Sequence, residues 1–307
     1  MTSAGRFAPS PSGELHVGNL RTAILAWLFA RSSGRRFLMR VEDLDRARAG
    51  AEAEQLRDLA AIGVTWDGGV VRQTDRQPLY AEAIGRLTAA GLTYECFCTR
   101  REIQEAPSAP HAPQGAYPGT CRGLSAAELE LKRAARPAAV RLRASVAEGT
   151  VRDVLHGSYT GMVDDFVLRR NDGVTAYNLA VVVDDAAQGI DQVVRGDDLL
   201  PSTPRQAYLA SLLNMPVPEY AHVPLVLNAD GARLAKRDGA VTLADLARAG
   251  VPVDAVRDAL LASLALPEGA LEQALAVFDP AALPREPWVW PGVRHGTGRR
   301  GTGRRGA

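Results

Sequence analysis

Hydrophobic and polar positions in the first ninety residues follow two alternating spacings, one typical of buried strands and one typical of helices. Short apolar runs at residues 6–8 and 37–41 predict strands, whereas residues 20–30 carry apolar side chains at helical spacing. Similar helical patterns, each followed by a glycine, cover residues 51–62 and 78–90. Strands that alternate with helices pair in parallel through right-handed crossovers, so we expect an α/β fold built on a doubly wound parallel sheet.

The pattern changes between residues 94 and 175, where all three cysteines and a loop rich in proline, glycine and histidine occur. The elements expected from there on are a helix over 125–135, strands over 140–142 and 166–169, a helix over 177–183, a strand over 192–195, a helix over 197–213 and a last strand over 223–227. We interpret 94–175 as an insertion between two halves of the parallel sheet.

Beyond residue 242 the apolar positions keep helical spacing alone, as Val253, Val256 and Leu260 illustrate. Residues 296–307 repeat Gly-Thr-Gly-Arg-Arg and have almost nothing to bury, so we expect this stretch to be disordered. Its arginines could contact RNA, although a solvated tail is the simpler interpretation. The predicted organisation is the first half of a Rossmann-like domain over 1–93, an insertion over 94–175, the second half of that domain over 176–240, a helical segment over 241–285 and a basic tail over 286–307.

Composition limits the class of protein without indicating a partner. A chain of 307 residues with 46% hydrophobic and 23% charged side chains can hold two or three modules and has the balance of a globular protein. Its 36 basic and 35 acidic side chains nearly cancel, so any nucleic-acid surface must be local. The small, odd number of cysteines and the lack of a membrane-length apolar run or secretion signal lead us to expect the cytoplasm.

A candidate phosphate site follows the first expected strand. There the segment Arg6-Phe7-Ala8-Pro9-Ser10 leads through Gly13 into His16-Val17-Gly18-Asn19, at the start of the first expected helix. A glycine at that turn lets a base or a phosphate approach the backbone, and the helix N-terminus favours an anion. His16 can hydrogen-bond a phosphate oxygen as charge builds there, and Asn19 suits a helix cap. Taken alone, His-x-Gly is also compatible with an ordinary strand-to-helix turn.

A basic segment follows the last expected strand, in the run Asp230-Gly231-Ala232-Arg233-Leu234-Ala235-Lys236-Arg237. A lysine on a flexible loop can follow the negative charge that develops as pyrophosphate leaves ATP. A basic surface hairpin is the alternative for this segment on its own. The phosphate-binding turn and the mobile lysine together predict chemistry on a nucleoside triphosphate.

These two segments resemble the HIGH and KMSKS motifs of class I aminoacyl-tRNA synthetases, in the form used by the glutamate and glutamine enzymes. The run 195–203 resembles the corresponding run of those enzymes, and the match extends from Gly5 to about Leu266. Where the family usually has serine before the lysine, this chain has Ala235. The resemblance implies a Rossmann-like catalytic domain that binds ATP with Mg²⁺, His16, Gly18 and Lys236 as catalytic residues, and an ATP-binding set of His16, Gly18, Asn19 and Lys236.

The charges of an amino acid with two carboxylates indicate what its pocket requires. Arg6 and Arg195, each at the end of an expected strand, could pair with a carboxylate, and Glu42 could hold the ammonium group. Tyr177 offers a hydroxyl. The alternative is that Arg6 and Glu42 simply pair with each other. The resemblance implies that glutamate is bound by Arg6, Phe7, Ala8, Pro9, Ser10, Glu42, Tyr177 and Arg195.

The three cysteines, Cys96, Cys98 and Cys121, offer soft ligands for zinc, which takes four ligands in a tetrahedron. The spacing leaves the fourth ligand open among Tyr117, His111 and water, and three unrelated cysteines in a reducing cell are the alternative. The pattern Cys-x-Cys followed by Tyr-x-x-x-Cys-Arg resembles the zinc site of the glutamyl-Q tRNA(Asp) synthetases, a shortened group within the family. That resemblance implies one structural zinc ion held by Cys96, Cys98, Tyr117 and Cys121.

Full glutamyl-tRNA synthetases carry a large helical region that reads the anticodon, whereas this sequence has one small helical segment and a tail after the shared part. The resemblance to the shortened group implies that L-glutamate is activated with ATP and transferred to the queuosine base in the anticodon loop of tRNA(Asp). Segment 94–175 then corresponds to an acceptor-binding insertion and 241–285 to a stem-contact segment. We expect a monomer without a protein partner.

Two other functions remain open. A short glutamyl-tRNA synthetase would charge the acceptor end of its tRNA. A catalytically silent relative would only bind tRNA, although the joint presence of His16, Gly18, Glu42, Arg195 and Lys236 argues against it. Exchange of pyrophosphate into ATP with glutamate, measured without tRNA, separates the three functions.

Overall fold

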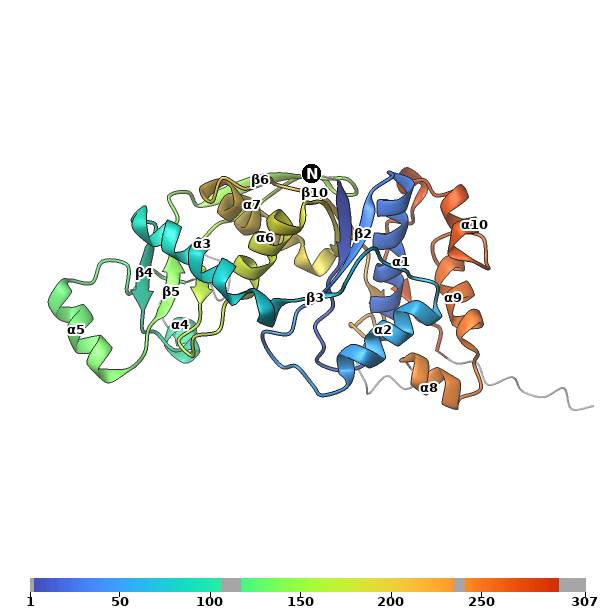
Figure 1. Ribbon diagram of the computed structural model, residues 1–307, viewed down its shortest axis with the longest axis horizontal. Helices are drawn as coiled ribbons and strands as arrows, with labels where there is room; N and C mark the ends of the chain where they lie inside the picture. The colour runs from blue at the N-terminus through green and yellow to red at the C-terminus, as the bar shows by residue number, and fades with distance from the viewer. Residues whose placement is uncertain (1–2, 106–116, 235–240, 293–307) are drawn as a thin grey trace, which may run out of the picture.

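A computed structural model of the chain describes residues 3–105, 117–234 and 241–292. Figure 1 shows an elongated molecule in which a large sheet lies between a small sheet at one end and the C-terminal helices at the other. None of the helices in these ranges is both long and apolar enough to cross a membrane. The predicted disordered stretch, 296–307, lies outside the described residues.

The large sheet has seven strands in the order β3-β2-β1-β9-β10-β6-β7. These strands are β1 (Ala4–Phe7), β2 (Arg36–Val41), β3 (Val71–Arg72), β6 (Glu148–Asp153), β7 (Gly157–Met162), β9 (Ile190–Gly196) and β10 (Glu219–Val223). All neighbours pair in parallel except β6 and β7, which form an antiparallel hairpin. The predicted doubly wound parallel sheet is confirmed. Its order reverses between β1 and β9, and ligands of such sheets bind beyond the carboxyl ends of the strands at that point.

Helices cover both faces of this sheet (Figure 1). On one side, α1 (Val17–Ser32) contacts β1 and β9 as well as α9 (Val253–Ala262) and α10 (Leu271–Ala276), and nearly all of its residues are buried. A helix enclosed in this way is apolar on most sides, and the charged Arg21 buried in α1 is satisfied by Ser263 Oγ and the Pro224 carbonyl, both at 3.0 Å. On the other side, α6 (Tyr177–Gln188) packs between α3 (Gln77–Ala89) and α7 (Thr203–Leu212). The start of α1 is therefore held rigidly at the carboxyl end of β1.

The small sheet is antiparallel, with strands in the order β4 (Thr93–Cys96), β5 (Ala139–Leu142) and β8 (Val167–Arg169). Helices α4 (Arg100–Glu105) and α5 (Ala126–Ala135) lie beside it (Figure 1). The sequence did not indicate the β6–β7 hairpin. It lies between β5 and β8 in the chain, but it forms the edge of the large sheet and not part of the small one. Segment 94–175 is thus divided between two sheets, and its limits as one insertion stay a prediction.

Prolines account for two differences from the predicted elements. The helix expected over 197–213 is divided into the 3₁₀ helix η2 (Asp197–Ser202) and α7, because Pro201 and Pro204 have no N–H to donate. The strand expected over 223–227 is divided at Pro224 into β10 and β11 (Val226–Leu227). The other described elements are α2 (Ala51–Ala61), η1 (Gln73–Arg76), α8 (Leu243–Arg248) and η4 (Pro280–Ala282).

The expectation of helices alone after residue 242 is wrong at one place. There β12 (Trp288–Val289) pairs in parallel with β11, and Trp288 N and Trp290 N donate to the carbonyls of Leu225 and Leu227. Two residues are too few for strand periodicity to appear in a sequence. The chain therefore returns to the strand that follows β10 just before residue 293.

Candidate active site

A cavity of about 590 Å³ opens at the carboxyl ends of β1, β2 and β9. The sequence-predicted residues that line it are Arg6, Phe7, Ala8, Pro9, Ser10, His16, Gly18, Asn19, Glu42, Tyr177 and Arg195. The fold thus brings together segments that are far apart in the sequence, at the place where a doubly wound sheet binds its ligand. The roles of these residues toward a ligand stay predictions. A larger hollow of about 950 Å³, over β6, β10 and α7, contains none of them.

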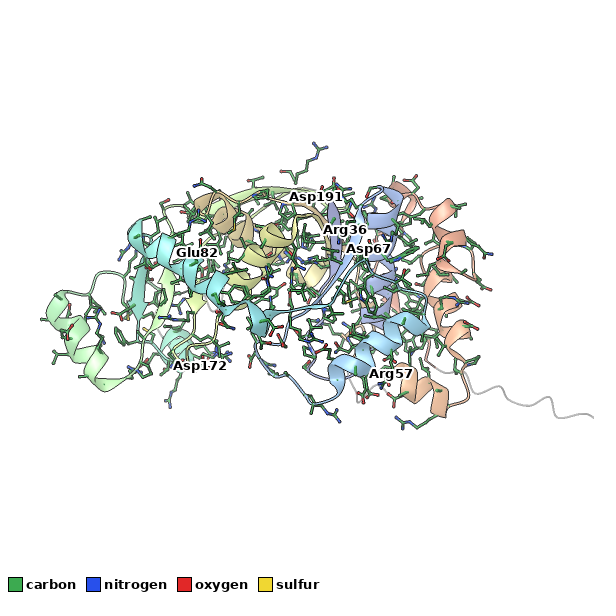
Figure 2. The ribbon with its side chains drawn as sticks, viewed as in Figure 1. Arg36, Arg57, Asp67, Glu82, Asp172 and Asp191 are labelled. Carbon is green, nitrogen blue, oxygen red and sulfur yellow. The ribbon has the colours of Figure 1, made fainter. Side chains whose placement is uncertain are left out.

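The opposite edge of the sheet is closed by charged contacts. Arg35 pairs with Asp191 at 2.9 Å, and Arg31 pairs with Asp67 at 2.7 Å. Figure 2 labels both carboxylates, which lie near the strand starts. Exposed pairs of this kind add little stability, but they satisfy the polar groups at that edge. Arg6, Arg195 and the N-terminus of α1 lie instead at the carboxyl edge, where the cavity opens.

His16 and Asn19 cap α1 reciprocally. The His16 Nδ1 accepts from the Asn19 backbone N–H at 3.2 Å, and the Asn19 Oδ1 accepts from the His16 backbone N–H at 3.2 Å. Burial lowers the pKa of His16, and the nearby charge of Arg233 lowers it further. The ring is therefore neutral near pH 7 with its proton on Nε2. It can donate one hydrogen bond to an oxygen in the cavity.

Gly18 leaves the first turn of α1 open. A Cβ at this position would lie 3.0 Å from the His16 ring and 3.3 Å from the Val226 Cβ. Only glycine avoids both contacts, so the backbone here is accessible from the cavity. This geometry agrees with the prediction that a flat base or a phosphate lies against the turn, which stays a prediction.

Arg6 is nearly fully buried and is held by a carboxylate that the sequence did not indicate. The Arg6 Nε lies 3.2 Å from Asp185 Oδ1, and the same oxygen accepts from Arg40 NH1 at 2.7 Å. Arg40 also lies 3.4 Å from Glu42 and 3.7 Å from Asp184, so three carboxylates pair with the two arginines and fix their guanidinium groups beside the cavity.

Glu42, at the end of β2, pairs with Arg40 at 3.4 Å, and its backbone N–H donates to the Pro9 carbonyl at 2.9 Å. The alternative in which Arg6 and Glu42 pair with each other is not what the structure has, because Arg6 pairs with Asp185. Burial raises the pKa of Glu42, against the opposing charges of Arg40 and Arg6. An ammonium group that reaches Glu42 would add a second positive partner beside Arg40 and favour the charged carboxylate.

Arg195, near the end of β9, is also buried and lies between neutral groups. Its Nε donates to His222 Nε2 at 3.0 Å, its NH2 donates to Thr203 Oγ1 at 2.9 Å, and its NH1 lies 3.5 Å from the Tyr177 hydroxyl. Within the described part of the chain, none of these hydrogen-bond partners is a carboxylate. The guanidinium charge is therefore available to an anionic ligand.

Lys236 lies outside the described residues, in 235–240. The residues before this segment, Arg233 and Leu234, line the cavity. Just after it, the Val241 carbonyl accepts from the Val17 backbone N–H at 2.9 Å, at the start of α1. Both flanks of the predicted lysine segment therefore reach the turn that carries His16.

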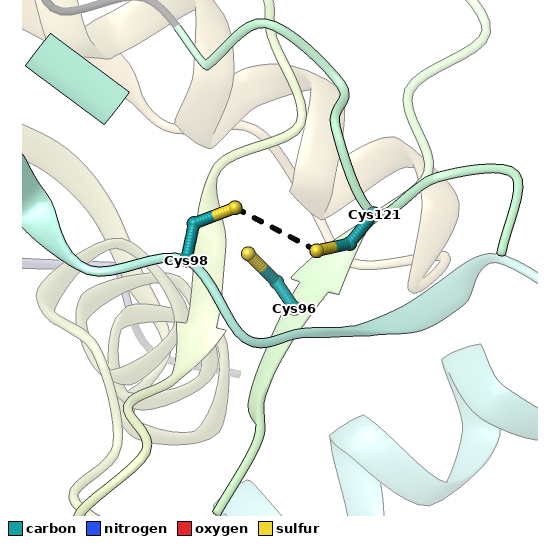
Figure 3. A group of neighbouring side chains, drawn as sticks. All are labelled: Cys96, Cys98 and Cys121. Atoms are coloured by element: carbon teal, nitrogen blue, oxygen red, sulfur yellow. Dashed lines mark hydrogen bonds between the residues drawn. The ribbon is translucent and has the colours of Figure 1, made fainter. Parts of the chain in front are cut away.

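The three cysteines converge in the small sheet region (Figure 3). Their sulfur atoms lie within 4.8 Å of one another, and Cys98 Sγ is 3.6 Å from Cys121 Sγ. Cys96 and Cys121 are buried, and burial raises the pKa of the Cys98 thiol to about 11. Tetrahedral zinc with bonds of about 2.3 Å requires sulfurs about 3.8 Å apart, so the three thiols have the spacing of a zinc site.

Tyr117 stands where a fourth ligand would be needed. Its hydroxyl lies 3.3 Å from Cys96 Sγ and 3.8 Å from Cys98 Sγ, and it accepts from the Cys121 backbone N–H at 2.8 Å. The Arg141 guanidinium carbon lies 3.7 Å from the Tyr117 ring centroid, a cation–π contact that holds the ring, while burial and the hydrogen bond with Cys96 raise the pKa of the hydroxyl. The four groups fit a tetrahedral ion, whereas His111 lies outside the described residues. Zinc ligation itself stays a prediction.

Some residues that build the site carried no sequence signal. Asp185 and His222 hold the two arginines, and Gln55 donates to the carbonyls of Ser10 and Gly13 at 3.0 and 2.6 Å. They lie on α6, β10 and α2, far apart in the sequence. Only the fold brings them to the cavity, so no local motif could indicate them.

Comparison with known proteins places the chain in a family. Residues 4–273 match the family of class I tRNA synthetases (E and Q), catalytic domain. A glutamate tRNA ligase from Elizabethkingia meningosepticum, crystallised with its amino acid, superimposes with a TM-score of 0.80 at 25% identity, covering 94% of this chain and 66% of that one. The chain belongs to the class I aminoacyl-tRNA synthetases of the glutamate and glutamine type, which are ligases.

Similar sequences identify the group within this family to which the chain belongs. A glutamyl-Q tRNA(Asp) synthetase from Nocardia farcinica is 69% identical over 287 residues, which are 93% of this chain and 92% of that protein. The protein of the same name from Cutibacterium acnes is 52% identical over 271 residues, 87% of this chain and 77% of that one. Within the class I enzymes, the chain belongs with the glutamyl-Q tRNA(Asp) synthetases.

Proposed function

We propose that this protein activates L-glutamate with ATP to glutamyl-adenylate and transfers the glutamate to the queuosine base in the anticodon loop of tRNA(Asp). The observation that carries the proposal is the convergence of a phosphate-binding turn, two buried arginines and a buried glutamate in one cavity. Membership of the family supports the reaction class, and the name of the similar proteins supports the tRNA.

Glutamate is bound through its charges in this proposal. Arg6 and Arg195 offer positive charge to its carboxylates, and Glu42 offers negative charge to its ammonium group. Tyr177 contributes its hydroxyl, and the backbone of residues 7–10 forms the wall of the cavity beside Arg6. Because each arginine is held by other residues before the ligand arrives, little side-chain entropy is lost on binding.

Activation proceeds by attack of a glutamate α-carboxylate oxygen on the α-phosphorus of ATP, with departure of pyrophosphate. The His16 Nε2–H donates to a phosphate oxygen, Gly18 and Asn19 leave the α1 N-terminus open to the nucleotide, and Lys236 follows the charge on the leaving group. Mg²⁺ accompanies ATP and neutralises part of its charge. The hydroxyl of queuosine then displaces AMP from glutamyl-adenylate, so the protein forms no covalent intermediate of its own.

We assign Cys96, Cys98, Tyr117 and Cys121 as the ligands of one structural zinc ion. The spacing of the four groups and the alignment of the Tyr117 hydroxyl by the Cys121 backbone N–H support this assignment. The ion would tie β4 to residues 117–121 and so stabilise the small sheet. The cytoplasmic location of the protein and its monomeric state stay predictions.

Two measurements test the proposed function. Glutamate-dependent exchange of pyrophosphate into ATP in the absence of tRNA is expected, and its dependence on tRNA would favour a short glutamyl-tRNA synthetase instead. Labelled glutamate is then offered to tRNA(Asp) with and without queuosine. Transfer only to the queuosine-containing tRNA is expected, whereas equal transfer to both would contradict the proposal. No exchange under any condition would indicate a silent tRNA-binding protein.

A further inference from the structure

Arg195 is the last member of a buried hydrogen-bond chain that begins at Asp153. His222 Nδ1 lies 2.6 Å from Asp153 Oδ2, and His222 Nε2 lies 3.0 Å from Arg195 Nε. The three residues come from adjacent strands, β6, β10 and β9, and His222 stands in register beside Arg195. The side chains of Asp153 and His222 are fully buried.

The contacts of Asp153 fix where the ring proton lies. Its carboxylate also accepts from the backbone N–H groups of Leu155, His156 and His222 at 2.8, 2.9 and 3.1 Å. These donors and the His222 ring lower the pKa of Asp153 against the effect of burial, so it is ionised. An ionised Asp153 can only accept, and His222 Nδ1 must therefore carry the proton.

The neutral ring then presents an acceptor to Arg195. Arginine carries donors only, so the His222 Nε2 lone pair is the group that holds Arg195 Nε. Thr203 Oγ1 lies 3.1 Å from the same nitrogen and accepts from Arg195 NH2 at 2.9 Å. His222 and Thr203 thus hold Nε and NH2, two of the three guanidinium nitrogens. The third nitrogen, NH1, makes only a long contact to the Tyr177 hydroxyl and lies on the side of the cavity.

Apart from Thr203, the other polar groups near His222 in the described part of the chain do not contact its ring nitrogens together with Arg195. His156 Nε2 contacts the His222 backbone carbonyl at 3.0 Å, and the Tyr220 ring stacks on His222 with centroids 6.0 Å apart. Neither reaches the ring nitrogens. The direction of Arg195 therefore depends on the tautomer of His222, and the tautomer depends on Asp153.

We propose that Asp153 and His222 are positioning residues for glutamate: Asp153 sets the His222 tautomer, and His222 aims Arg195 at a substrate carboxylate. This inference rests on the proposed function, since it assumes that Arg195 binds glutamate. It assigns a role to two buried residues that touch neither substrate. Such a role differs from simple packing, because it depends on which atom of residue 222 accepts a hydrogen bond.

Two substitutions at residue 222 separate the ring nitrogens. In His222→Gln the amide oxygen can take the place of Nε2 and accept from Arg195, while Asp153 keeps its three backbone donors. In His222→Asn the amide nitrogen can take the place of Nδ1 and donate to Asp153, but Arg195 loses its acceptor. We expect His222→Asn to raise the KM for glutamate in the exchange reaction by about tenfold or more, with the KM for ATP little changed. His222→Gln is expected to stay within about threefold of the unsubstituted protein.

Asp153→Asn provides the second arm of the test. An asparagine amide can donate to Nδ1, which places the ring proton on Nε2 opposite the Arg195 Nε–H, and the KM for glutamate should again rise about tenfold. In the His222→Gln background the same change should have little further effect, because the acceptor no longer depends on residue 153. Thermal unfolding of each variant establishes that it is folded.

The outcomes are distinguishable. Equal glutamate KM values for His222→Asn and His222→Gln, or an effect of Asp153→Asn that persists in the Gln background, would overturn the positioning role. If His222→Asn does not fold, comparison of Asp153→Asn in the two backgrounds decides the question. An unsubstituted protein without glutamate-dependent exchange would instead remove the proposed function and the inference with it.

Discussion

Gly18 and His16 lie so close that a single methyl group would force them apart. A Cβ on Gly18 would be 3.0 Å from the His16 ring, whose Nδ1 is already engaged by the Asn19 backbone. The ring cannot move without breaking the cap of α1. The glycine thereby fixes both the access to the helix N-terminus and the direction of the His16 donor.

We expect Gly18→Ala to lower glutamate-dependent pyrophosphate exchange by about tenfold or more, because the added Cβ would displace the His16 ring and small misplacements at a reacting centre reduce the rate strongly. Gly85→Ala is the matched control, because Gly85 lies inside α3 and an added Cβ there meets nothing within 4 Å. That variant should be as active as the unsubstituted protein. Full exchange activity in Gly18→Ala would show that the turn is not part of the site.

Lys236→Ala is expected to reduce the exchange rate about a hundredfold, the typical cost of removing one charged donor from a developing oxyanion. Thermal unfolding should be unchanged. The control is Lys132→Ala, on α5 at the far end of the molecule from the cavity. An unaltered exchange rate in Lys236→Ala would remove this segment from the mechanism.

Zinc is expected at one ion per chain when metal content is measured on the purified protein. Cys121→Ser should abolish most of that content and lower the thermal midpoint by about 5 °C or more, because metal binding contributes directly to folding.

Tyr117→Phe should weaken zinc affinity about tenfold in competition with a coloured chelator, whereas Tyr159→Phe, on β7, should leave it unaltered. Unchanged affinity in Tyr117→Phe would assign the fourth position to another group. A protein that contains no zinc after growth with the metal would contradict the site as a whole.

Asp58 predicts a pH dependence of stability. Burial and the negative charges of Glu14 and Glu54 raise its pKa to about 6, although Arg57 opposes them. A carboxyl with a raised pKa in the folded state stabilises the fold while it is protonated, and this contribution is lost as pH rises through about 6.

Asp58→Asn should therefore raise the thermal midpoint by about 1–3 °C at pH 7.5 and by roughly half as much at pH 5, which lies between the unfolded and folded pKa values of this carboxyl. Asp254→Asn, on the exposed side of α9, is the control and should show no such difference between the two pH values. A larger gain at pH 5 than at pH 7.5 would contradict the assignment.

Local patterns predicted most of the helices and, in the large sheet, the strands β1, β2 and β9, because each of those elements has its own periodicity. Residues 51–62 and 78–90, for example, correspond closely to α2 and α3. The β6–β7 hairpin was missed because its residues alternate weakly, and its place at the sheet edge is fixed by pairing with β10. Short strands such as β12 are defined by their partner and not by their own sequence.

The site was predictable where chemistry and motif coincide, as at His16, Gly18 and Arg195. It was not predictable where one buried side chain supports another. Asp185 lies inside α6 among apolar residues, and His222 lies in an apolar strand. Their importance follows only from the distances to Arg6 and Arg195, which are properties of the fold.

The pairing of Trp288–Val289 with Val226–Leu227 has a practical consequence for shortened versions of the protein. Cutting the chain after residue 285 would expose a free strand edge directly beside Val226, one of the residues around the nucleotide cavity. Open edges of this kind recruit strands from other molecules. Such a fragment should self-associate. The pairing of Trp288–Val289 with β11 therefore protects the protein against aggregation.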